Sequence, residues 1–480
     1  MRRTPATRRV PLPAMSLLQD ALARQRAAAR ANPVPDEAAR RADLQALARF
    51  VRENADDLCA AISRDYGHRS THETRLTEVL PVLREVEHAL THLRAWMKPR
   101  RRAVDRLAFG LASNTVIPQP LGVVGVIVPW NFPLNLSLVP LVAILAAGNR
   151  ALVKMSEHSR HLAALLIERI PAYFPPEKLR FFDETGGVGV AFSQLPLDHL
   201  LFTGSGTTGR AVMAAAAANL CPVTLELGGR SPALVCDDFD LRTAAERILY
   251  VKCLNAGQIC TTVDHLYLPR ARVQEFVALA RRIVPARYAS LASPDYTSII
   301  SGSAYQRLTR ALDEAQAQGA TVIPLLPGPA RDDAAHRLAP HLVLDAPKGS
   351  ALMQREIFGP LLPVVPYDHL DEAVAAINAG PRPLAFYPFT HDRVRLAHLL
   401  DHVMSGGVSV NDALLHVAQA DLPFGGVGES GMGHYHGREG FETFSKLRPV
   451  FHQSRFALTH LLYPPYRGGF ERLLKFLQPR

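Results

Sequence analysis

The chain has 480 residues, a length that is too great for one hydrophobic core and predicts two or three domains. Its composition, 48% hydrophobic and 20% charged, excludes an intrinsically disordered protein. The net charge of +10 comes from Lys and Arg spread along the whole sequence, which argues against nucleic acid as a partner and leaves only a bias toward small anionic ligands.

Cysteine usage and apolar segments bear on the cellular compartment. The five cysteines form no Cys-x-x-Cys pair and no zinc-like spacing, so we expect a reducing, cytoplasmic setting and no metal site. The basic start, residues 1–9, is not followed by the apolar stretch of a signal peptide and predicts a disordered tail. The longest apolar segment, 134–147, is shorter than the ~20 residues of a membrane span and predicts a core helix.

From the N-terminus onward, the predicted elements change from helices to alternating strands and helices. Apolar residues at helical spacing predict helices over 17–96, and a strand or ribbon is predicted over 114–120. Buried strands then alternate with helices from 125 to 227, and a second series of the same kind runs from 231 to about 411. This alternation predicts the α/β class with doubly wound, parallel sheets. The strands predicted in the first series are 125–128, 151–154, 179–182, 199–203 and 223–227.

A glycine-rich turn, Gly204-Ser205-Gly206-Thr-Thr-Gly209, follows one predicted strand and begins a helix. Its spacing is that of the dinucleotide-binding pattern, in which glycine lets the backbone approach a pyrophosphate and the helix N-terminus supplies N–H donors. A tight turn without a ligand is the alternative, but the position between strand and helix favours phosphate binding. The same pattern offers Glu226, about 20 positions further on, as a ribose ligand.

Glu226 has a second interpretation. It lies in a predicted strand between Leu225 and Leu227, ahead of a glycine pair. Among apolar residues a carboxylate loses water and its pKa rises, which suits a general base better than a ribose ligand. A strand residue that faces solvent is the remaining alternative.

Cys260 ends the segment Asn255-Ala-Gly-Gln-Ile-Cys260, which follows a predicted helix over 241–254. A free cysteine is usually a buried structural residue, whereas a thiol at such a junction can be a nucleophile. Asn131 lies in the turn Pro129-Trp-Asn-Phe-Pro133, at the end of a predicted strand. Its amide is suited to donate to an oxyanion, although the segment alone also fits an ordinary rigid turn.

Three further charged residues follow strand ends or precede turns. Lys154 and Glu157 come after the predicted strand 151–154, where they can hold ribose hydroxyls or form a solvated pair. Glu356 precedes the turn Ile-Phe-Gly-Pro360 and supplies one more carboxylate, whose role its own sequence leaves open.

Six motifs in order resemble the NAD(P)-dependent aldehyde dehydrogenase superfamily over residues 17–451. Besides the turn around Asn131, they are Phe202-Thr-Gly-Ser205, Leu225-Glu-Leu-Gly-Gly229, Gly257-Gln-Ile-Cys260, Glu356-Ile-Phe-Gly-Pro360 and Leu422-Pro-Phe-Gly-Gly-Val-Gly428. A closer resemblance, to the coniferyl aldehyde dehydrogenases and related class 3 enzymes, rests on Gly67-His-Arg-Ser70, residues 430–437 and Tyr463-Pro-Pro-Tyr466.

The resemblance implies oxidation of an aldehyde to the carboxylic acid. Cys260 would attack the aldehyde carbon, and the Asn131 amide together with the Cys260 backbone N–H would hold the oxyanion. Hydride transfer would convert the thiohemiacetal into a thioester, which water activated by Glu226 would hydrolyse. The implied substrate is aromatic, as in coniferyl aldehyde, or a medium- to long-chain aliphatic aldehyde.

The resemblance also implies a site for NAD, with NADP as the second candidate because Glu157 would repel a 2′-phosphate. Lys154 and Glu157 are assigned to the adenine-side ribose, the glycine-rich turn to the pyrophosphate and Glu356 to the nicotinamide ribose. The full set of implied cofactor residues is Trp130, Lys154, Glu157, Gly204, Ser205, Gly209, Glu356 and Phe358.

The family fold implies two Rossmann-type α/β domains and a small β element for oligomerisation, in a homodimer or homotetramer. Apolar residues at 470, 473, 474 and 477 predict an amphipathic helix in the tail, which either caps a neighbouring subunit or contacts a membrane surface. The expected segments are a helical part of the cofactor domain (1–106), an oligomerisation ribbon (107–124), the dinucleotide-binding domain (125–229), the catalytic domain (230–411), a return to the cofactor domain with an oligomerisation strand (412–452) and the tail (453–480).

Departures from the family pattern concern the substrate more than the reaction. The chain has Met155 after Lys154, Arg230 where the family has Lys, and Thr261-Thr-Val263 beside the nucleophile. A CoA-acylating dehydrogenase would use the same thioester, although Glu226 favours water as the acceptor. Two further hypotheses are a thiol hydrolase that needs no cofactor and a catalytically silent binding protein.

Overall fold

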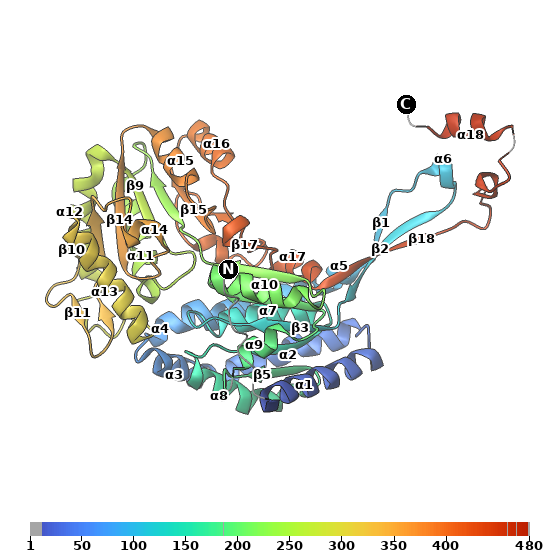
Figure 1. Cartoon of the computed structure of the whole chain (residues 1–480), viewed down its shortest axis with the longest axis horizontal. Coiled ribbons are helices and arrows are strands. Elements are labelled where there is room, and N and C mark those ends of the chain that lie inside the picture. Colours follow the sequence, from blue (N-terminus) through green and yellow to red (C-terminus); the bar gives the residue numbers. More distant parts are fainter. Residues whose placement is uncertain (1–11, 186, 458, 467, 479–480) are drawn as a thin grey trace, which may run out of the picture.

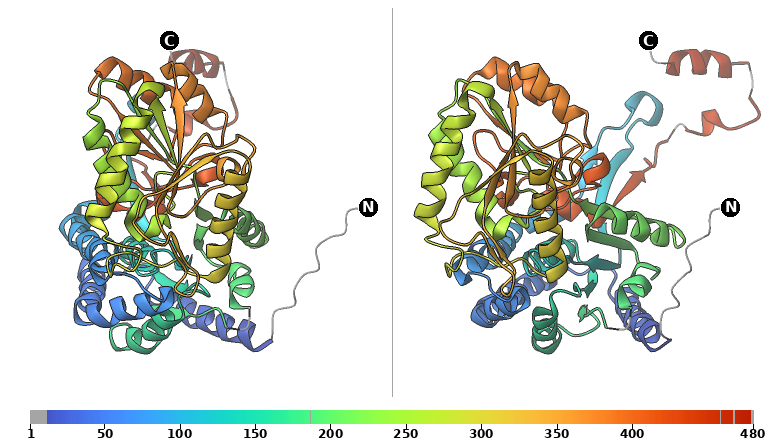
Figure 2. Two further views of the ribbon diagram at one scale, coloured as in Figure 1. Left: turned by 90° about the vertical axis from the view of Figure 1, so that its left-hand side faces the viewer. Right: turned by 60° about the vertical axis from the view of Figure 1, so that its left-hand side comes forward.

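The computed structural model describes residues 12–185, 187–457, 459–466 and 468–478. Figures 1 and 2 show two α/β bodies packed against each other and a narrow arm that carries the C-terminal helix away from them. The α/β class predicted from the alternating pattern is confirmed. The basic start predicted to be a disordered tail, residues 1–9, lies outside the described residues.

The helical first part is also confirmed. Gly67 ends the third helix with a φ of 76°, a conformation that costs glycine little, and so separates this helix from the next. The helices are α1 (Leu12–Ala31), α2 (Glu37–Glu53), α3 (Ala55–Tyr66), α4 (Thr71–Thr74) and α5 (Leu80–Met97), with a π-helical turn at Arg75–Val79 between the last two.

The first body is built on a six-stranded sheet in the order β17-β7-β6-β3-β4-β5. Five of these strands are parallel and only the short β17 is antiparallel to its neighbour. The strands are β3 (Val123–Ile127), β4 (Arg150–Lys154), β5 (Leu179–Phe182), β6 (His199–Gly204), β7 (Val223–Leu227) and β17 (Gly431–Met432). The helices between them are α7 (Asn135–Ala146), α8 (Arg160–Arg169), α9 (Val188–Ser193) and α10 (Gly206–Ala217). Because the strands are parallel, their carboxyl ends and the loops that follow share one edge of the sheet.

The second body contains a seven-stranded sheet in the order β10-β13-β14-β9-β8-β15-β16, in which only the edge strand β10 is antiparallel. Its strands are β8 (Pro232–Val235), β9 (His265–Pro269), β10 (Thr321–Pro324), β13 (His341–Leu344), β14 (Leu361–Tyr367), β15 (Ala385–Phe389) and β16 (Gly407–Val408). A small ribbon joins β11 (Arg331–Asp332) to β12 (Arg337–Leu338). The helices are α11 (Leu241–Cys253), α12 (Val273–Arg287), α13 (Gly302–Ala317), α14 (Ala351–Gln354), α15 (Leu370–Asn378) and α16 (Arg393–His402).

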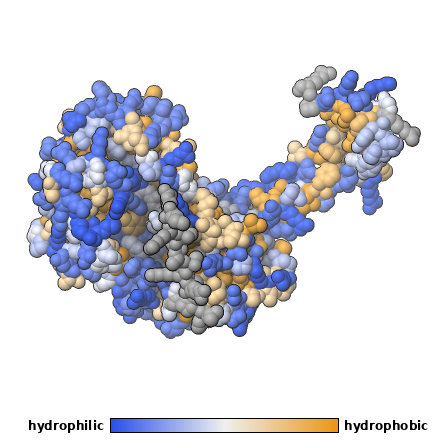
Figure 3. Space-filling model, viewed as in Figure 1, coloured by the Kyte–Doolittle hydropathy of each residue, from blue (hydrophilic) through white to orange (hydrophobic). Residues whose placement is uncertain are grey.

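The arm is a three-stranded antiparallel sheet in the order β1-β2-β18. Its strands are β1 (Arg100–Arg102), β2 (Ser113–Pro120) and β18 (Ser445–His452), and the helices near it are α6 (Arg106–Phe109), α17 (Gly437–Thr443) and α18 (Phe470–Leu477). The sequence did not predict β1, because three arginines show no apolar alternation and only pairing with β2 makes them a strand. Apolar side chains are exposed along the arm (Figure 3), Leu111 and Phe456 among them.

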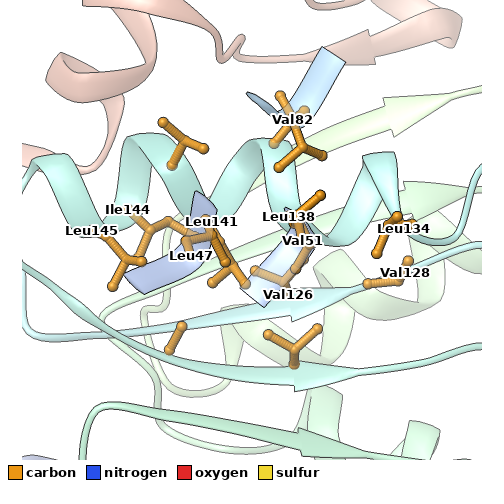
Figure 4. Close-up of a cluster of buried hydrophobic side chains, with 14 of the residues drawn as sticks. Leu47, Val51, Val82, Val126, Val128, Leu134, Leu138, Leu141, Ile144 and Leu145 are labelled. Atoms are coloured by element: carbon orange, nitrogen blue, oxygen red, sulfur yellow. The ribbon is translucent and has the colours of Figure 1, made fainter. Parts of the chain in front are cut away.

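Helix α7 forms the centre of the first core. Ten of its residues are buried, so it shows no polar face, which explains why its sequence is an apolar run. Figure 4 shows α7 with Val82 of α5 on one side and Val126 of β3 on the other. Within the described part of the chain, no helix is both long and apolar enough to cross a lipid bilayer.

Candidate active site

The segment before Cys260 makes a sharp turn at the end of α11. Asn255, Ala256 and Gly257 follow one another with φ values of 50°, 49° and 72°, a left-handed run that two non-glycine residues adopt only under constraint. At Gly257 a Cβ atom would lie 2.2 Å from the Gly359 carbonyl oxygen, so only glycine fits. The turn ends the helix and presents Cys260, which is partly exposed, at the wall of a cavity.

Gln258 holds this turn through its side-chain amide. Its Nε2 donates to the carbonyl oxygens of Asn255 and Ser298 at 2.9 and 3.1 Å, and its Oε1 accepts from the Ile300 N–H at 3.0 Å. The Asn255 N–H donates to the buried Glu73 carboxylate at 3.0 Å. The backbone next to the thiol is therefore fixed on both sides before any ligand binds.

Asn131 lies beside the same turn, at the carboxyl end of β3. It is buried, and its Nδ2 donates to the Gln258 carbonyl oxygen at 3.3 Å. The Asn131 carbonyl oxygen accepts from the Tyr66 hydroxyl at 2.8 Å and from the Asn255 amide at 3.1 Å. The bonds to Gln258 and Asn255 join segments that are 127 and 124 residues apart. The second Nδ2 hydrogen of Asn131 has no protein acceptor among the described residues.

Arg69 supports the Asn131 turn, and sequence reasoning missed it. Its guanidinium is buried, pairs with Glu78 at 2.5 Å and with Glu73 at 3.4 Å, and donates to the Asn131 carbonyl oxygen at 3.3 Å. It also lies 4.8 Å from the centre of the Phe132 ring. The only sequence signal was the segment Gly67-His-Arg-Ser70, because a buried arginine looks like any surface arginine when its partners are unknown.

Glu226 lies on β7 and is 2% exposed. Among the described residues, no donor hydrogen-bonds either oxygen, and burial raises the pKa of this carboxyl well above its ordinary value. Its charge is one of those that raise the pKa of the Cys260 thiol. This placement favours a general base over the ribose ligand that the glycine spacing offered.

The surroundings of the Cys260 thiol favour its protonated form. Burial raises its pKa to about 12, and the carboxylates of Glu356 and Glu226 add to the effect. The Thr261 side chain acts in the opposite direction, because its hydrogen bond lowers the thiol pKa. Formation of the Cys260 thiolate therefore requires removal of a proton.

One side of Cys260 opens into an apolar cavity of about 300 Å³. Tyr435, which sequence reasoning did not single out, is fully buried and lines this cavity, and the charges of Glu226 and Cys260 add to burial in raising its pKa. The lining also includes Phe132, Leu136, Leu254, Ile259, Thr261, Leu414, Val417, Phe424 and His436, with Arg84, Asn135 and Tyr250 among its polar members.

The glycine-rich turn between β6 and α10 fits a pyrophosphate. Ser205 caps α10, and its hydroxyl accepts from the Thr208 N–H at 3.2 Å. A Cβ at Gly209 would lie 2.6 Å from Leu227, so glycine lets the helix pack close to the sheet. The turn is partly open to solvent, and the 12-residue helix presents its free N–H groups there.

Lys154 and Glu157 lie at the adjoining edge, at and just after the end of β4. The Lys154 ammonium forms an ion pair with Glu184, a residue that the sequence had not singled out. The Glu157 carboxylate is 56% exposed and accepts from the Ser156 hydroxyl at 3.2 Å. The sequence offered no signal for Glu184, because it lies in a loop after β5 without a recognised motif.

Glu356 lies beside the turn that follows β7. Its carboxylate accepts from the Gly229 N–H at 3.1 Å, and a Cβ at Gly228 would lie 2.1 Å from it. Burial, followed by the charge of Asp264, raises its pKa to about 8. Phe358 has a φ of 49°, and its ring meets the Trp130 ring edge to face at 5.4 Å. Glu356 and this aromatic pair are not among the residues that line the apolar cavity.

Comparisons with known proteins agree with this geometry. The profile of the aldehyde dehydrogenase family matches residues 9–450. A probable coniferyl aldehyde dehydrogenase of Pseudomonas aeruginosa is 48% identical over 458 residues, which are 95% of each protein. The substrate-bound structure of Staphylococcus aureus AldH superimposes with a TM-score of 0.90, at 31% identity over 96% of this chain and 99% of that one.

A structure with a bound dinucleotide belongs to the same group. The aldehyde dehydrogenase of Mycobacterium tuberculosis complexed with NAD+ has a TM-score of 0.82 and 26% identity, over 93% of this chain and 91% of its own. The family match covers most of the sequence, and the Pseudomonas aeruginosa relative is aligned over nearly its whole length. The chain therefore belongs to the aldehyde dehydrogenase family, and it is an NAD(P)-dependent oxidoreductase that converts aldehydes to carboxylic acids.

Proposed function

We propose that the enzyme oxidises aromatic aldehydes of the coniferyl type through a covalent intermediate on Cys260. The observation that carries the proposal is the position of this thiol, which lies at the wall of an apolar cavity and within the electrostatic influence of the buried Glu226, a carboxylate with no hydrogen-bond partner among the described residues. A planar aromatic aldehyde matches the aromatic and aliphatic lining and needs few polar partners there. The similar Pseudomonas aeruginosa protein bears the name of a probable coniferyl aldehyde dehydrogenase, and medium- to long-chain aldehydes are the second substrate class.

In the first half of the reaction, Cys260 gives its proton to solvent water, and the thiolate attacks the aldehyde carbon, whose carbonyl π electrons move to the oxygen. The substrate oxygen then carries the negative charge, and the free Nδ2 hydrogen of Asn131 and the Cys260 backbone N–H stabilise it. The hydrogen bonds from Tyr66 and Asn255 fix the Asn131 backbone, so this donor needs no rearrangement during the step. The cofactor, when bound, accepts the hydride that leaves the former aldehyde carbon.

In the second half, the enzyme hydrolyses the thioester on Cys260. Glu226 takes a proton from water, the water oxygen adds to the acyl carbon, and the Cys260 thiolate leaves. Burial raises the affinity of Glu226 for protons, which is the property that a base needs at neutral pH. The carboxylic acid then leaves through the apolar cavity.

The cofactor site that we propose follows the edge of the first sheet. The turn at Gly204, Ser205 and Gly209 holds the pyrophosphate, and Lys154 and Glu157 hold the adenine-side ribose. Glu356 holds the nicotinamide ribose beside Trp130 and Phe358.

Steady-state kinetics with cinnamyl, benzyl and long-chain aldehydes, each with NAD and NADP, tests this proposal. We expect the highest kcat/KM with cinnamyl-type aldehydes, because the lining is rich in flat, apolar surface. Product analysis with and without CoA must yield the free acid in both cases. A CoA ester, or aldehyde turnover that needs no dinucleotide, contradicts the assigned chemistry.

We further propose the six-segment organisation given by the sequence and a homodimer or homotetramer joined through the arm. Exposed apolar residues on the arm, such as Leu111 and Phe451, support such an interface. The C-terminal helix α18 would cap a neighbouring subunit. The side chain of Leu473, one residue of its predicted apolar face, lies outside the described residues. Sedimentation measures the assembly, and co-sedimentation with anionic vesicles at low salt tests the alternative of membrane contact.

A further inference from the structure

Glu184 is a carboxylate that neither the motifs nor the chemistry on Cys260 uses. Strands β4 and β5 are parallel neighbours, with Lys154 opposite Phe182, so the residues that follow both strands reach the same edge of the sheet. Glu184 comes two residues after β5, and its carboxylate pairs with the Lys154 ammonium. This pair therefore lies where the first sheet receives the adenine-side ribose.

The local structure holds Glu184 in place. Its Oε1 accepts from the Gly189 N–H at 3.2 Å, near the start of α9. A Cβ at Gly189 would lie 2.8 Å from the Glu184 carboxylate and 3.2 Å from Lys154 Nζ, so glycine leaves the space in which the pair forms. Helix α9 in turn contacts α10, which begins at the glycine-rich turn.

Glu184 is also better shielded from solvent than Glu157. The side chain of Glu184 is 27% exposed and its partner Lys154 is 8% exposed, whereas Glu157 is 56% exposed. Water and salt screen an exposed carboxylate more effectively than one that is mostly buried. Of the two carboxylates near Lys154, Glu184 thus exerts the stronger field on a neighbouring ligand.

We propose that Glu184, rather than Glu157, makes the enzyme select NAD against NADP. This inference rests on the cofactor site proposed above. A carboxylate can accept a hydrogen bond from the ribose 2′-hydroxyl of NAD, but it repels the 2′-phosphate of NADP, which adds about two negative charges. Lys154 and Glu184 compensate each other's charge in this pair, so Lys154 has no spare positive charge for a 2′-phosphate, which would still meet the carboxylate oxygens of Glu184 at close range.

Binding of the reduced dinucleotides to the full-length protein tests the proposal without any aldehyde. Dissociation constants for NADH and NADPH are measured by nucleotide fluorescence in the wild type and in Glu184→Gln. We expect the substitution to lower the ratio Kd(NADPH)/Kd(NADH) by about tenfold or more, through tighter NADPH and weaker NADH. Glu184→Asp keeps the charge and must hold the ratio within about threefold of the wild type, which guards against a general effect of altering the loop.

Glu168→Gln is the matched control, because it removes the same charge from the exposed surface of α8. Glu168 lies eight residues beyond the start of that helix, about 12 Å along its axis, so its charge is screened and the ratio should change by less than about twofold. An unchanged ratio in Glu184→Gln overturns the proposal. So does a tenfold change in Glu157→Gln alone, which would assign the selection to Glu157.

The readout also separates this inference from the proposed reaction. Nucleotide binding does not require Cys260 or Glu226, so an error in the assigned chemistry leaves both dissociation constants measurable. If the wild type binds neither nucleotide, the cofactor site itself is misplaced and the proposal about Glu184 is wrong with it.

Discussion

The two sides of Cys260 differ in how their side chains are stabilised. On the cavity side, Phe132, Leu136 and Ile259 bury apolar surface and need no particular partner. Outside the cavity lining, on what we call the charged side, Lys252 and Asp264 are ionisable groups that are almost completely buried. The first side tolerates changes in shape, whereas the second depends on each charge keeping its neighbours.

The charged side shows this dependence in its pKa values. Burial lowers the pKa of Lys252 to about 8, although the charge of Asp264 acts in the opposite direction. Among the described residues, no acceptor hydrogen-bonds the Lys252 Nζ. The pKa of Asp264 is lowered. Burial alone would raise it, but His265 and other partners outweigh burial, and the His265 Nδ1 lies 2.6 Å from the Asp264 carboxylate. Substitutions on the charged side should therefore affect folding, and those on the apolar side should affect kinetics.

The largest effect on activity is expected from substitution of Cys260 itself. Cys260→Ala removes the nucleophile and should lower kcat by about 10⁴-fold or more, while the midpoint of urea unfolding stays close to that of the wild type. Reduced-cofactor formation at saturating aldehyde measures the rate. A variant that retains a hundredth of the wild-type activity would show that another group performs the attack.

Glu226→Gln should have the next largest effect and should separate the two half-reactions. The steady-state rate is expected to fall by about 10²- to 10⁴-fold, while stopped-flow absorbance still shows an initial burst of reduced cofactor. In the wild type, hydrolysis should accelerate as pH rises through the raised pKa of Glu226, because only the ionised form accepts a proton. The Gln variant should lack this pH dependence, and an unaltered steady-state rate would remove Glu226 from the mechanism.

Asp264→Asn tests the charged side through stability. Removing one member of a buried charged cluster should lower the free energy of unfolding by about 3–5 kcal/mol, measured by urea titration. Because the folded pKa of Asp264 is lowered, its contribution is present above the unfolded pKa and is lost as pH falls through the folded one.

The matched control for Asp264→Asn is Asp313→Asn. Asp313 pairs with Arg331 on the surface and is 56% exposed, so its loss should cost less than about 1 kcal/mol. Equal losses in the two variants would contradict the contrast drawn between the two sides of Cys260.

Thr261→Val should produce the smallest effect, on the apolar side. The substitution keeps the shape and removes the hydroxyl that lowers the pKa of Cys260, so less thiolate forms at a given pH. Alkylation of Cys260 by iodoacetamide at pH 8 should slow by about 3- to 10-fold, with little change in unfolding. An unchanged alkylation rate would mean that the threonine shapes the cavity without assisting the thiol.

Much of the fold could be predicted from local sequence. Buried parallel strands are apolar runs and the helices between them have their own spacing, so the alternation from 125 to 411 was visible without contacts. Cys260, Glu226 and Asn131 could be named because each lies in a short motif at the end of an element or within a strand. Strand β1 and the pairing of β17 with β7 could not be predicted, because a distant partner imposes them.

The sequence by itself therefore determined the fold class, the family and the residues to which the chemistry is assigned, since these depend on local pattern and on ordered motifs. Only the tertiary structure decided what surrounds those residues. It joined the Asn131 amide to the Gln258 carbonyl, left Glu226 without a hydrogen-bond partner among the described residues and paired Lys154 with Glu184. The physical reason is that burial and charge pairing depend on groups distant in sequence, and they set the pKa values on which the proposed reaction depends.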